Sequence, residues 1–271
     1  MSLIIISKEN TIMTTNCLRT RRLFDQSSGR SFMVALDRTL GVGVEPFTES
    51  PGTLIQSVIE GGADAMLLSP GLIKQFGMLA AFHGGPVLVA RIDYPFMYES
   101  TQGKGEEFRL IASVEEVVAL GADAVVMFLT TLVEERRVFA DNAAAVGRVA
   151  RECRRLGIPL IVEAVPWGKA STDHHDPATV IQSARIAAEL GADIVKTENL
   201  DDAEQMHRLV TSCPVPVLML GGPSLPLDQL LERTSRGLAS GAKGVVFGRN
   251  AWQRTDAAEA MSALRALVHE G

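Results

Sequence analysis

The chain has 271 residues, of which 46% are hydrophobic and 21% charged, a composition typical of a folded protein and not of a disordered one. Its net charge of −6 argues against nucleic-acid binding, because the only basic cluster, Arg19, Arg21 and Arg22, is too short to neutralise a phosphate backbone. The three widely spaced cysteines favour a reduced, cytoplasmic protein, and no apolar run approaches the roughly 18 residues that a membrane-spanning helix needs.

Residues 1–21 are predicted to form an N-terminal extension that is partly disordered and lies outside the fold. The start, Met1–Ile6, is apolar, but Ser7-Lys8-Glu9-Asn10 interrupts it before the apolar core of a signal peptide is complete. Met13 offers a second natural start, so the first dozen residues contribute nothing to the prediction of the fold. Residues 22–271 are predicted to form a single domain.

A repeated tripeptide marks the boundaries of the predicted elements. Gly-Ala-Asp or Gly-Ala-Lys follows a helix-like segment and precedes a short apolar run at Gly62, Gly121, Gly191 and Gly241. Glycine just past a helix adopts the left-handed conformation that ends it at little steric cost. Three further apolar runs begin at Pro86, Pro159 and Pro216, at the first strand position, where proline loses no ladder hydrogen bond. Together with Phe32–Leu36, these runs predict eight strands.

The apolar runs are continuous and not alternating, which indicates strands covered on both faces and hence a parallel sheet. The stretches between them have helical periodicity, as in 176–190, where the apolar face is expected to carry Ile181, Ala184, Ala188 and Leu190. Eight such units predict an α/β fold in the form of a (β/α)₈ TIM barrel, which leaves no strand at an edge. An open doubly wound sheet is the alternative.

Barrel active sites lie at the carboxyl ends of the strands, so the residues that end the predicted strands are candidates for chemistry. In chain order these are Asp37, Ser69, Arg91 with Asp93, Phe128 with Thr130, Glu163, Lys196 with Glu198, Gly221-Gly222, and Gly248-Arg249.

Lys196 is the principal catalytic candidate because it ends the apolar strand that begins after Ala192-Asp193. Desolvation and the neighbouring Arg91 are expected to lower its pKa, and a neutral amine can attack a carbonyl group to form a Schiff base. The alternative is a structural lysine that pairs with an acidic residue at the strand end.

Two acidic residues are candidates for proton transfer. Asp37 closes the first strand and is expected to hydrogen-bond the lysine or handle a substrate hydroxyl proton. Glu163 follows Leu160-Ile161-Val162, and these apolar neighbours are expected to raise its pKa towards neutrality. Each residue also has a purely structural interpretation. Asp37 would then form an ion pair with Arg38 or Arg91, and Glu163 would form one with Lys196 or Arg91.

The glycines after the last two strands predict a phosphate site, since backbone N–H groups and a short helix bind phosphate there in many barrels. Gly221, Gly222 and Gly248 allow a close approach of the ligand, and a guanidinium adds a bidentate contact. The residues expected to bind substrate or phosphate are therefore Gly221, Gly222, Gly248, Arg249, Arg91 and Ser224. The loop Thr101–Gly105 is predicted to be an ordinary solvated loop, and the alternative is a polar lid in which Lys104 contacts phosphate.

A metal site is not expected. His174 and His175 are adjacent on a loop rich in aspartate, but their surroundings lack the spacing of a zinc motif. The neighbouring Asp176, or Thr172, is instead typical of a helix N-cap.

Several of these segments resemble the archaeal-type class I fructose-bisphosphate aldolase family. The similar segments are Leu36-Asp37, Ile194-Val195-Lys196-Thr197, Gly221-Gly222-Pro223 and Gly248-Arg249-Asn250-Ala251-Trp252-Gln253. That family includes the metal-independent thiolase of autoinducer-2 breakdown, and Cys213-Pro214-Val215-Pro216-Val217 is similar to that branch. The resemblance runs from about Arg22 to the C-terminus.

The resemblance implies a (β/α)₈ barrel without metal or cofactor, with Lys196 as the Schiff-base nucleophile and Asp37 close to it. It also implies phosphate binding by Gly221, Gly222, Gly248 and Arg249, and a ring-like homo-oligomer. Two positions depart from the family. The first strand ends in Asp37-Arg38-Thr39 where these aldolases usually carry Asp-His-Gly, and Val165 replaces a tyrosine that donates a proton. Glu163, on the same strand face, is expected to take over that transfer.

The sequence therefore predicts a class I aldolase that cleaves or forms a C–C bond in a phosphorylated ketose or related small carbonyl compound. The alternatives are thiolase-type acyl transfer from a phosphorylated diketone to coenzyme A, a phosphate-binding isomerase without a Schiff base, and a barrel that has lost catalysis and senses a sugar phosphate. The identity of the substrate depends on loop side chains that no sequence rule interprets.

Overall fold

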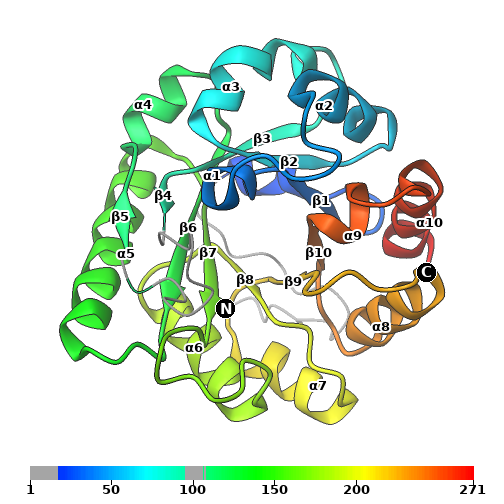
Figure 1. Cartoon of the computed structure of the whole chain (residues 1–271). Coiled ribbons are helices and arrows are strands. Elements are labelled where there is room, and N and C mark those ends of the chain that lie inside the picture. The colour runs from blue at the N-terminus through cyan, green and yellow to red at the C-terminus, as the bar shows by residue number, and fades with distance from the viewer. Residues whose placement is uncertain (1–17, 95–105, 107) are drawn as a thin grey trace, which may run out of the picture.

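A computed structural model describes residues 18–94, 106 and 108–271, and at its centre parallel strands close into a barrel with helices around it (Figure 1). The barrel strands are β1 (Ser31–Ala35), β2 (Ala65–Leu68), β3 (Val87–Arg91), β6 (Ala124–Thr130), β7 (Leu160–Val165), β8 (Ile194–Thr197), β9 (Val217–Leu220) and β10 (Gly244–Phe247). They neighbour one another in the order β1-β10-β9-β8-β7-β6-β3-β2, and β1 also pairs with β2. The predicted TIM barrel is thus confirmed, and the open sheet is excluded.

The outer layer consists of helices that follow the strands. They are α2 (Pro51–Glu60), α3 (Pro70–Phe76), α4 (Val114–Ala119), α5 (Arg136–Leu156), α6 (Pro177–Glu189), α7 (Ala203–Ser212), α8 (Leu227–Ala239) and α10 (Ala257–Glu270). Shorter elements are α1 (Thr39–Val42), α9 (Arg249–Trp252), the 3₁₀ helices η1 (Leu18–Leu23) and η2 (Gly77–Ala80), and the antiparallel pair β4 (Asp93–Tyr94) and β5 (Arg109–Leu110).

The repeated tripeptide performs the helix-to-strand turn that the sequence predicts. All four of its glycines have positive φ, namely Gly62 (72°), Gly121 (98°), Gly191 (106°) and Gly241 (108°). The residue two positions after each glycine then donates its backbone N–H to a carbonyl of the preceding strand, as Asp64 does to Phe32 at 2.9 Å. The strands predicted to open with proline begin one residue later, at Val87, Leu160 and Val217, because proline has no N–H to enter the ladder.

The predicted helix at 176–190 is α6, and the side chain of Asp176 caps it by accepting a hydrogen bond from the Thr179 N–H at 3.0 Å. Its buried face differs by one position from the expected one. The fully buried residues are Val180, Ser183, Ala184 and Ala187, whereas Ile181, Ala188 and Leu190 are half-buried at the edge. Small side chains face β7 because they let the helix approach the sheet closely.

Side chains of each barrel strand alternate between two cores. On β1, Phe32 and Val34 pack against the helices, whereas Met33 and Ala35 point into the barrel. Leu23 of η1, in the predicted barrel domain, joins the inner core, and Thr20 of the same 3₁₀ helix, which falls within the predicted N-terminal extension, is fully buried. The first 17 residues, and the loop Thr101–Gly105 with Lys104, lie outside the described residues.

Candidate active site

The charged candidates reach the barrel mouth because each continues the inward-facing series of its strand. Val87 and Val89 of β3 point into the barrel, and so does Arg91, two residues further on. By the same spacing of two, Glu163 follows the inward-facing Ile161 on β7, and Lys196 follows the inward-facing Ile194 on β8. These three side chains are at most 6% exposed, so buried charge gathers at one end of the barrel.

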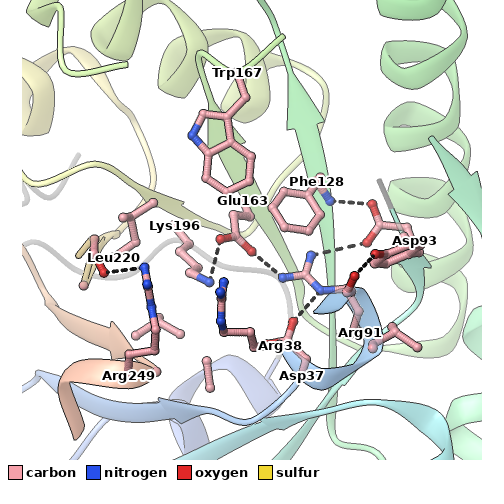
Figure 2. A pocket seen from close by; sticks show the side chains of 18 residues that line it. Asp37, Arg38, Arg91, Asp93, Phe128, Glu163, Trp167, Lys196, Leu220 and Arg249 are labelled. Atoms are coloured by element: carbon pink, nitrogen blue, oxygen red, sulfur yellow. Dashed lines mark hydrogen bonds and ion pairs between the residues drawn. The ribbon is translucent and has the colours of Figure 1, made fainter. Parts of the chain in front are cut away.

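A cavity of about 170 Å³ opens at this end, and Figure 2 shows the side chains that line it. All but one of the predicted site residues belong to its lining: Asp37, Arg91, Glu163, Lys196, Gly221, Gly222, Gly248 and Arg249. Ser224 does not; it is exposed on the loop after β9 and faces away from this lining set. Residues from β1, β3, β7, β8, β9 and β10 thus meet in one site, as expected for the carboxyl ends of barrel strands.

The amine of Lys196 lies 2.7 Å from Oε1 of Glu163, and the register pairs these two residues directly across β7 and β8. The other carboxylate oxygen of Glu163 accepts a hydrogen bond from Nη2 of Arg91. Glu163 therefore bridges the lysine and the arginine, as the dashed lines in Figure 2 show.

Arg91 makes a separate hydrogen bond from each nitrogen of its guanidinium. Its Nε donates to Asp37 at 2.8 Å and its Nη1 to Asp93 at 3.3 Å, in addition to the bond from Nη2 to Glu163. The ring of Phe128 lies against the guanidinium, with 4.0 Å between the ring centre and Cζ of Arg91. The Arg91 side chain is 2% exposed and is held by carboxylates on three sides, which agrees with the ion pairs named as structural alternatives for Asp37 and Glu163. That Arg91 also binds substrate phosphate stays a prediction.

The pKa expected for Glu163 is wrong in direction. Burial raises the pKa of this carboxyl, but the charges of Lys196 and Arg91 and their hydrogen bonds lower it by more, so the net shift is downward. The apolar neighbours along the strand were visible in the sequence, whereas the two cations came from β3 and β8. Asp93 shows the opposite balance: burial raises its pKa to about 6, despite Arg91 and a hydrogen bond from the Phe128 N–H.

The loops after β9 and β10 hold one another in place. The Asn250 side-chain amide donates to the carbonyls of Gly221 at 2.7 Å and Pro223 at 2.9 Å, and its oxygen accepts from Leu225 N–H. Gly222 has a φ of 62°, and a Cβ on Gly248 would lie 3.3 Å from the carbonyl oxygen of Ala35. Glycine is thus required for the shape of this part of the cavity wall.

Two arginines line the same side of the cavity, and both point into it in Figure 2. Arg38 follows β1 and pairs with Glu45 through Nε at 2.7 Å and Nη2 at 3.1 Å. Arg249 follows β10 and donates from Nη2 to the Gly222 carbonyl at 3.2 Å. Burial lowers the pKa of Arg249, and the charge of Arg38 lowers it further, while Glu45 opposes both.

Three further residues lie near the site: Phe128 and Glu198, which the sequence named only as strand-end candidates, and Trp167, which it did not name. Phe128 covers Arg91, and Trp167 lines the cavity and packs against Phe128 with ring centres 5.7 Å apart. The Trp167 side chain hydrogen-bonds Glu198, whose pKa burial raises to about 7. Only the inward spacing of Glu198 from Lys196 pointed to it in the sequence. Val165, where the resembling aldolases have tyrosine, is fully buried and offers no proton.

The two adjacent histidines have separate partners. His174 hydrogen-bonds Ser171 at 2.8 Å, and Nδ1 of His175 lies 3.7 Å from Glu198. In the part of the chain that the structure describes, no group of three or more His, Cys, Asp or Glu side chains is arranged to hold a metal ion. Among the helices described, none combines the length and apolar character needed to cross a membrane.

Comparison with known proteins identifies similar chains over most of the length. Residues 28–254 match the model of a family described as DeoC/LacD family aldolase. The chain is 30% identical to the class 1 fructose-bisphosphate aldolase of Thermoproteus tenax, over 90% of this chain and 91% of that protein. It is also 30% identical to the 2-amino-4,5-dihydroxy-6-oxo-7-(phosphonooxy)heptanoate synthase of Streptomyces griseus, over 93% of this chain and 89% of that protein. A solved structure of a Schiff-base-forming fructose-1,6-bisphosphate aldolase superposes with a TM-score of 0.82 at 28% identity, covering 92% of this chain and 98% of the other.

Proposed function

The chain belongs to the DeoC/LacD family of aldolases and is a class I, Schiff-base carbon–carbon lyase, and on this premise we propose that Lys196 is its nucleophile and a phosphorylated ketose its substrate. The observation that carries the proposal is one buried lysine amine at the floor of a cavity, with a carboxylate 2.7 Å away. The similar enzyme from Thermoproteus tenax is named for a bisphosphorylated ketose, which supports the substrate class.

The first step is attack of the Lys196 amine on the substrate ketone. Glu163 is placed to accept the proton that the ammonium must lose, because it already accepts a hydrogen bond from that group. Its lowered pKa keeps it ionised before the reaction. Addition gives a carbinolamine, and loss of its hydroxyl as water gives the iminium.

The iminium withdraws electrons from the bond to be cleaved. A base removes the proton from the hydroxyl on the far carbon, the C–C bond pair moves into the iminium, and an aldehyde leaves. The remaining enamine takes a proton on carbon, and water releases the second product from Lys196. Asp37, which Arg91 holds from the other side of the cavity, is our second proton-transfer residue.

Phosphate is proposed to bind at Gly221, Gly222, Gly248 and Arg249, after β9 and β10, on the side of β8 away from β7 and Glu163. The backbone there can approach a ligand closely, and Asn250 fixes the two loops relative to one another. Binding energy from this end of the substrate places the ketone at the amine, which is how remote contacts contribute to the rate. Ser224 is left out of this set because it does not line the cavity.

Reduction with borohydride tests the proposal. The protein is incubated with dihydroxyacetone phosphate, reduced, digested and analysed by mass spectrometry. We expect the reduced adduct on the peptide that contains Lys196 and on no other. Lys169, which is half exposed and pairs with Glu106 and Glu134 outside the cavity, is the internal control. An unmodified Lys196 peptide, or equal labelling of Lys169, would contradict the proposal.

We also propose that the protein works in the cytoplasm as a homo-oligomer. The two cysteines among the described residues, Cys153 and Cys213, are buried, and Cys213 is a free thiol, in keeping with a reducing compartment. Met78, Leu79 and Phe82, at and just after η2, are exposed apolar side chains of the kind that subunit contacts cover. Light scattering tests the assembly: a mass near 29.1 kDa would contradict it.

A further inference from the structure

The part of the cavity wall that follows β9, β10 and β1 contains more positive charge than the proposed phosphate site uses. Arg38 and Arg249 come from neighbouring strands, because β1 and β10 pair with Val34 next to Phe247. Both side chains line the cavity beside Gly221, Gly222 and Gly248. They are close enough for the charge of Arg38 to depress the pKa of Arg249.

The hydrogen bonds of the two guanidinium groups leave donors free. Glu45 takes Nε and Nη2 of Arg38, and among the described residues Nη1 has no acceptor. Arg249 makes one hydrogen bond to a carbonyl, and within the described ranges no carboxylate pairs with it. Bringing two like charges together with one counter-charge between them costs free energy, which an anion placed between them would offset.

The ion pair between Arg38 and Glu45 is also more buried than an ordinary surface pair. The Arg38 side chain is 33% exposed and that of Glu45 is 22% exposed, so their ion pair forms one rim of the cavity. A ligand that enters can contact the free edge of Arg38 without breaking its pair with Glu45. Glu45 thus orients Arg38 in advance, which reduces the ordering cost of binding.

We propose that Arg38 is a second arginine of the phosphate site and that it selects substrates with a dianionic phosphate over uncharged ketones. Arg38 and Arg249 bind the phosphate from two sides, with the glycine backbone beneath it, and the Arg38–Glu45 pair holds the first of these arginines in position. The inference rests on the proposed function for the location of the phosphate, but it assigns a residue and a selectivity that the proposed function does not need.

Titration calorimetry with inorganic phosphate tests this directly, with two variants that break the same ion pair. Arg38→Gln removes a charge-assisted contact of the kind that contributes roughly 1.5–3 kcal/mol, so we expect phosphate to bind about 10- to 150-fold more weakly. Glu45→Gln keeps the charge of Arg38, and the amide oxygen can still accept one of its hydrogen bonds, so we expect a much smaller loss of phosphate affinity than in Arg38→Gln.

Equal weakening in both variants would mean that the ion pair only shapes the rim, and would overturn the inference. Unchanged affinity in Arg38→Gln, or no phosphate binding by the wild type, would overturn it as well. Arg22→Gln, which removes an exposed arginine paired with Asp123 outside the cavity, controls for net charge and is expected to bind phosphate as the wild type does.

Borohydride trapping separates this inference from the proposed function. Arg38→Gln should raise the half-saturating concentration of dihydroxyacetone phosphate for labelling Lys196 by at least 10-fold, and leave that of dihydroxyacetone within twofold. A loss shared by both ketones would overturn the inference. If phosphate binds through Arg38 but the wild type is never labelled at Lys196, the proposed function fails and the inference stands.

Discussion

The two halves of the cavity use arginine in opposite ways. In the carboxylate half, which comprises Asp37, Arg91, Asp93, Glu163 and Lys196, each guanidinium nitrogen of Arg91 donates to a carboxylate. In the arginine half, which comprises Arg38, Gly221, Gly222, Gly248 and Arg249, two guanidinium groups have one carboxylate between them. In the carboxylate half the central guanidinium is buried among three carboxylates, whereas in the arginine half, among the described residues, Arg38 pairs with one carboxylate and Arg249 with none.

The difference shows that the number of carboxylates around an arginine decides what it can do. Each nitrogen of the Arg91 guanidinium already donates to a carboxylate, so we expect its effect on the reaction to pass through Glu163 and Asp37, which it positions. Arg38 and Arg249 keep donors free and are therefore suited to an anion. Sequence alone assigned Arg91 to substrate, because it ends a strand next to the site, and gave Arg38 no binding role.

Replacing Lys196 by Met tests the carboxylate half most severely. The variant keeps the length of the side chain but has no nucleophile, so we expect aldol cleavage to fall by about a thousandfold or more. The assay is steady-state cleavage of a ketose phosphate, with Lys169→Met as the matched control outside the cavity. A Lys196→Met enzyme with more than a tenth of wild-type activity would rule out the Schiff base.

Replacing Arg91 by Met tests whether this half is held by its central cation. Three carboxylates would lose their shared partner in a buried position, so we expect the free energy of unfolding to fall by about 3–5 kcal/mol. Urea denaturation measures it. Arg236→Met, which removes an exposed pair with Glu232, should cost about 1 kcal/mol or less. Similar losses in the two variants would show that Arg91 is an ordinary ion-pair residue.

Glu163→Gln sharpens the role of the bridging carboxylate. The amide keeps the size of the side chain but cannot accept the proton of the Lys196 ammonium, so we expect kcat to fall by about 100-fold. The KM for phosphorylated substrate should stay within threefold, because the arginine half is untouched. Glu232→Gln, in an exposed helical pair with Arg236, is the control. A rise in KM with unchanged kcat would move Glu163 from proton transfer to substrate binding.

The smallest effect concerns Glu198, just beyond Lys196. Burial raises its pKa to about 7 from an ordinary 4.5, so the folded state holds a proton that the unfolded state has released. Its contribution to stability is therefore full below pH 4.5 and is lost as the pH rises through 7. Between pH 5 and 8 we expect the wild type to lose about 2 kcal/mol of stability that Glu198→Gln does not lose.

Thermal or urea unfolding at the two pH values measures this difference. Glu189→Gln, in an exposed pair with Arg185, should show the pH dependence of the wild type. If the stability of Glu198→Gln and that of the wild type depend equally on pH, burial does not raise the pKa of the Glu198 carboxyl.

The fold could be predicted largely because its signals are local. Glycine at the helix ends and continuous apolar strands each report on a few neighbouring residues, and inward spacing then placed Lys196 and Glu163 at the mouth. The sequence named Lys196 and Arg91 as possible ion-pair partners of Glu163 but could not decide between ion pairing and apolar burial, since these side chains from β3 and β8 meet only in the closed barrel. The pairing of Arg38 with Glu45 was not predicted for another reason, because Glu45 lies on an irregular segment without the periodicity that would place its side chain.

The most direct test of the account is a crystal soaked with dihydroxyacetone phosphate and reduced in place. We predict continuous density from Nζ of Lys196 to the former carbonyl carbon, with Glu163 beside the bond. The phosphate should lie against Gly221, Gly222 and Gly248, between Arg38 and Arg249. Density for the adduct on another residue, or a phosphate beside Arg91 in the carboxylate half, would contradict the division of the cavity into a reacting half and an anchoring half.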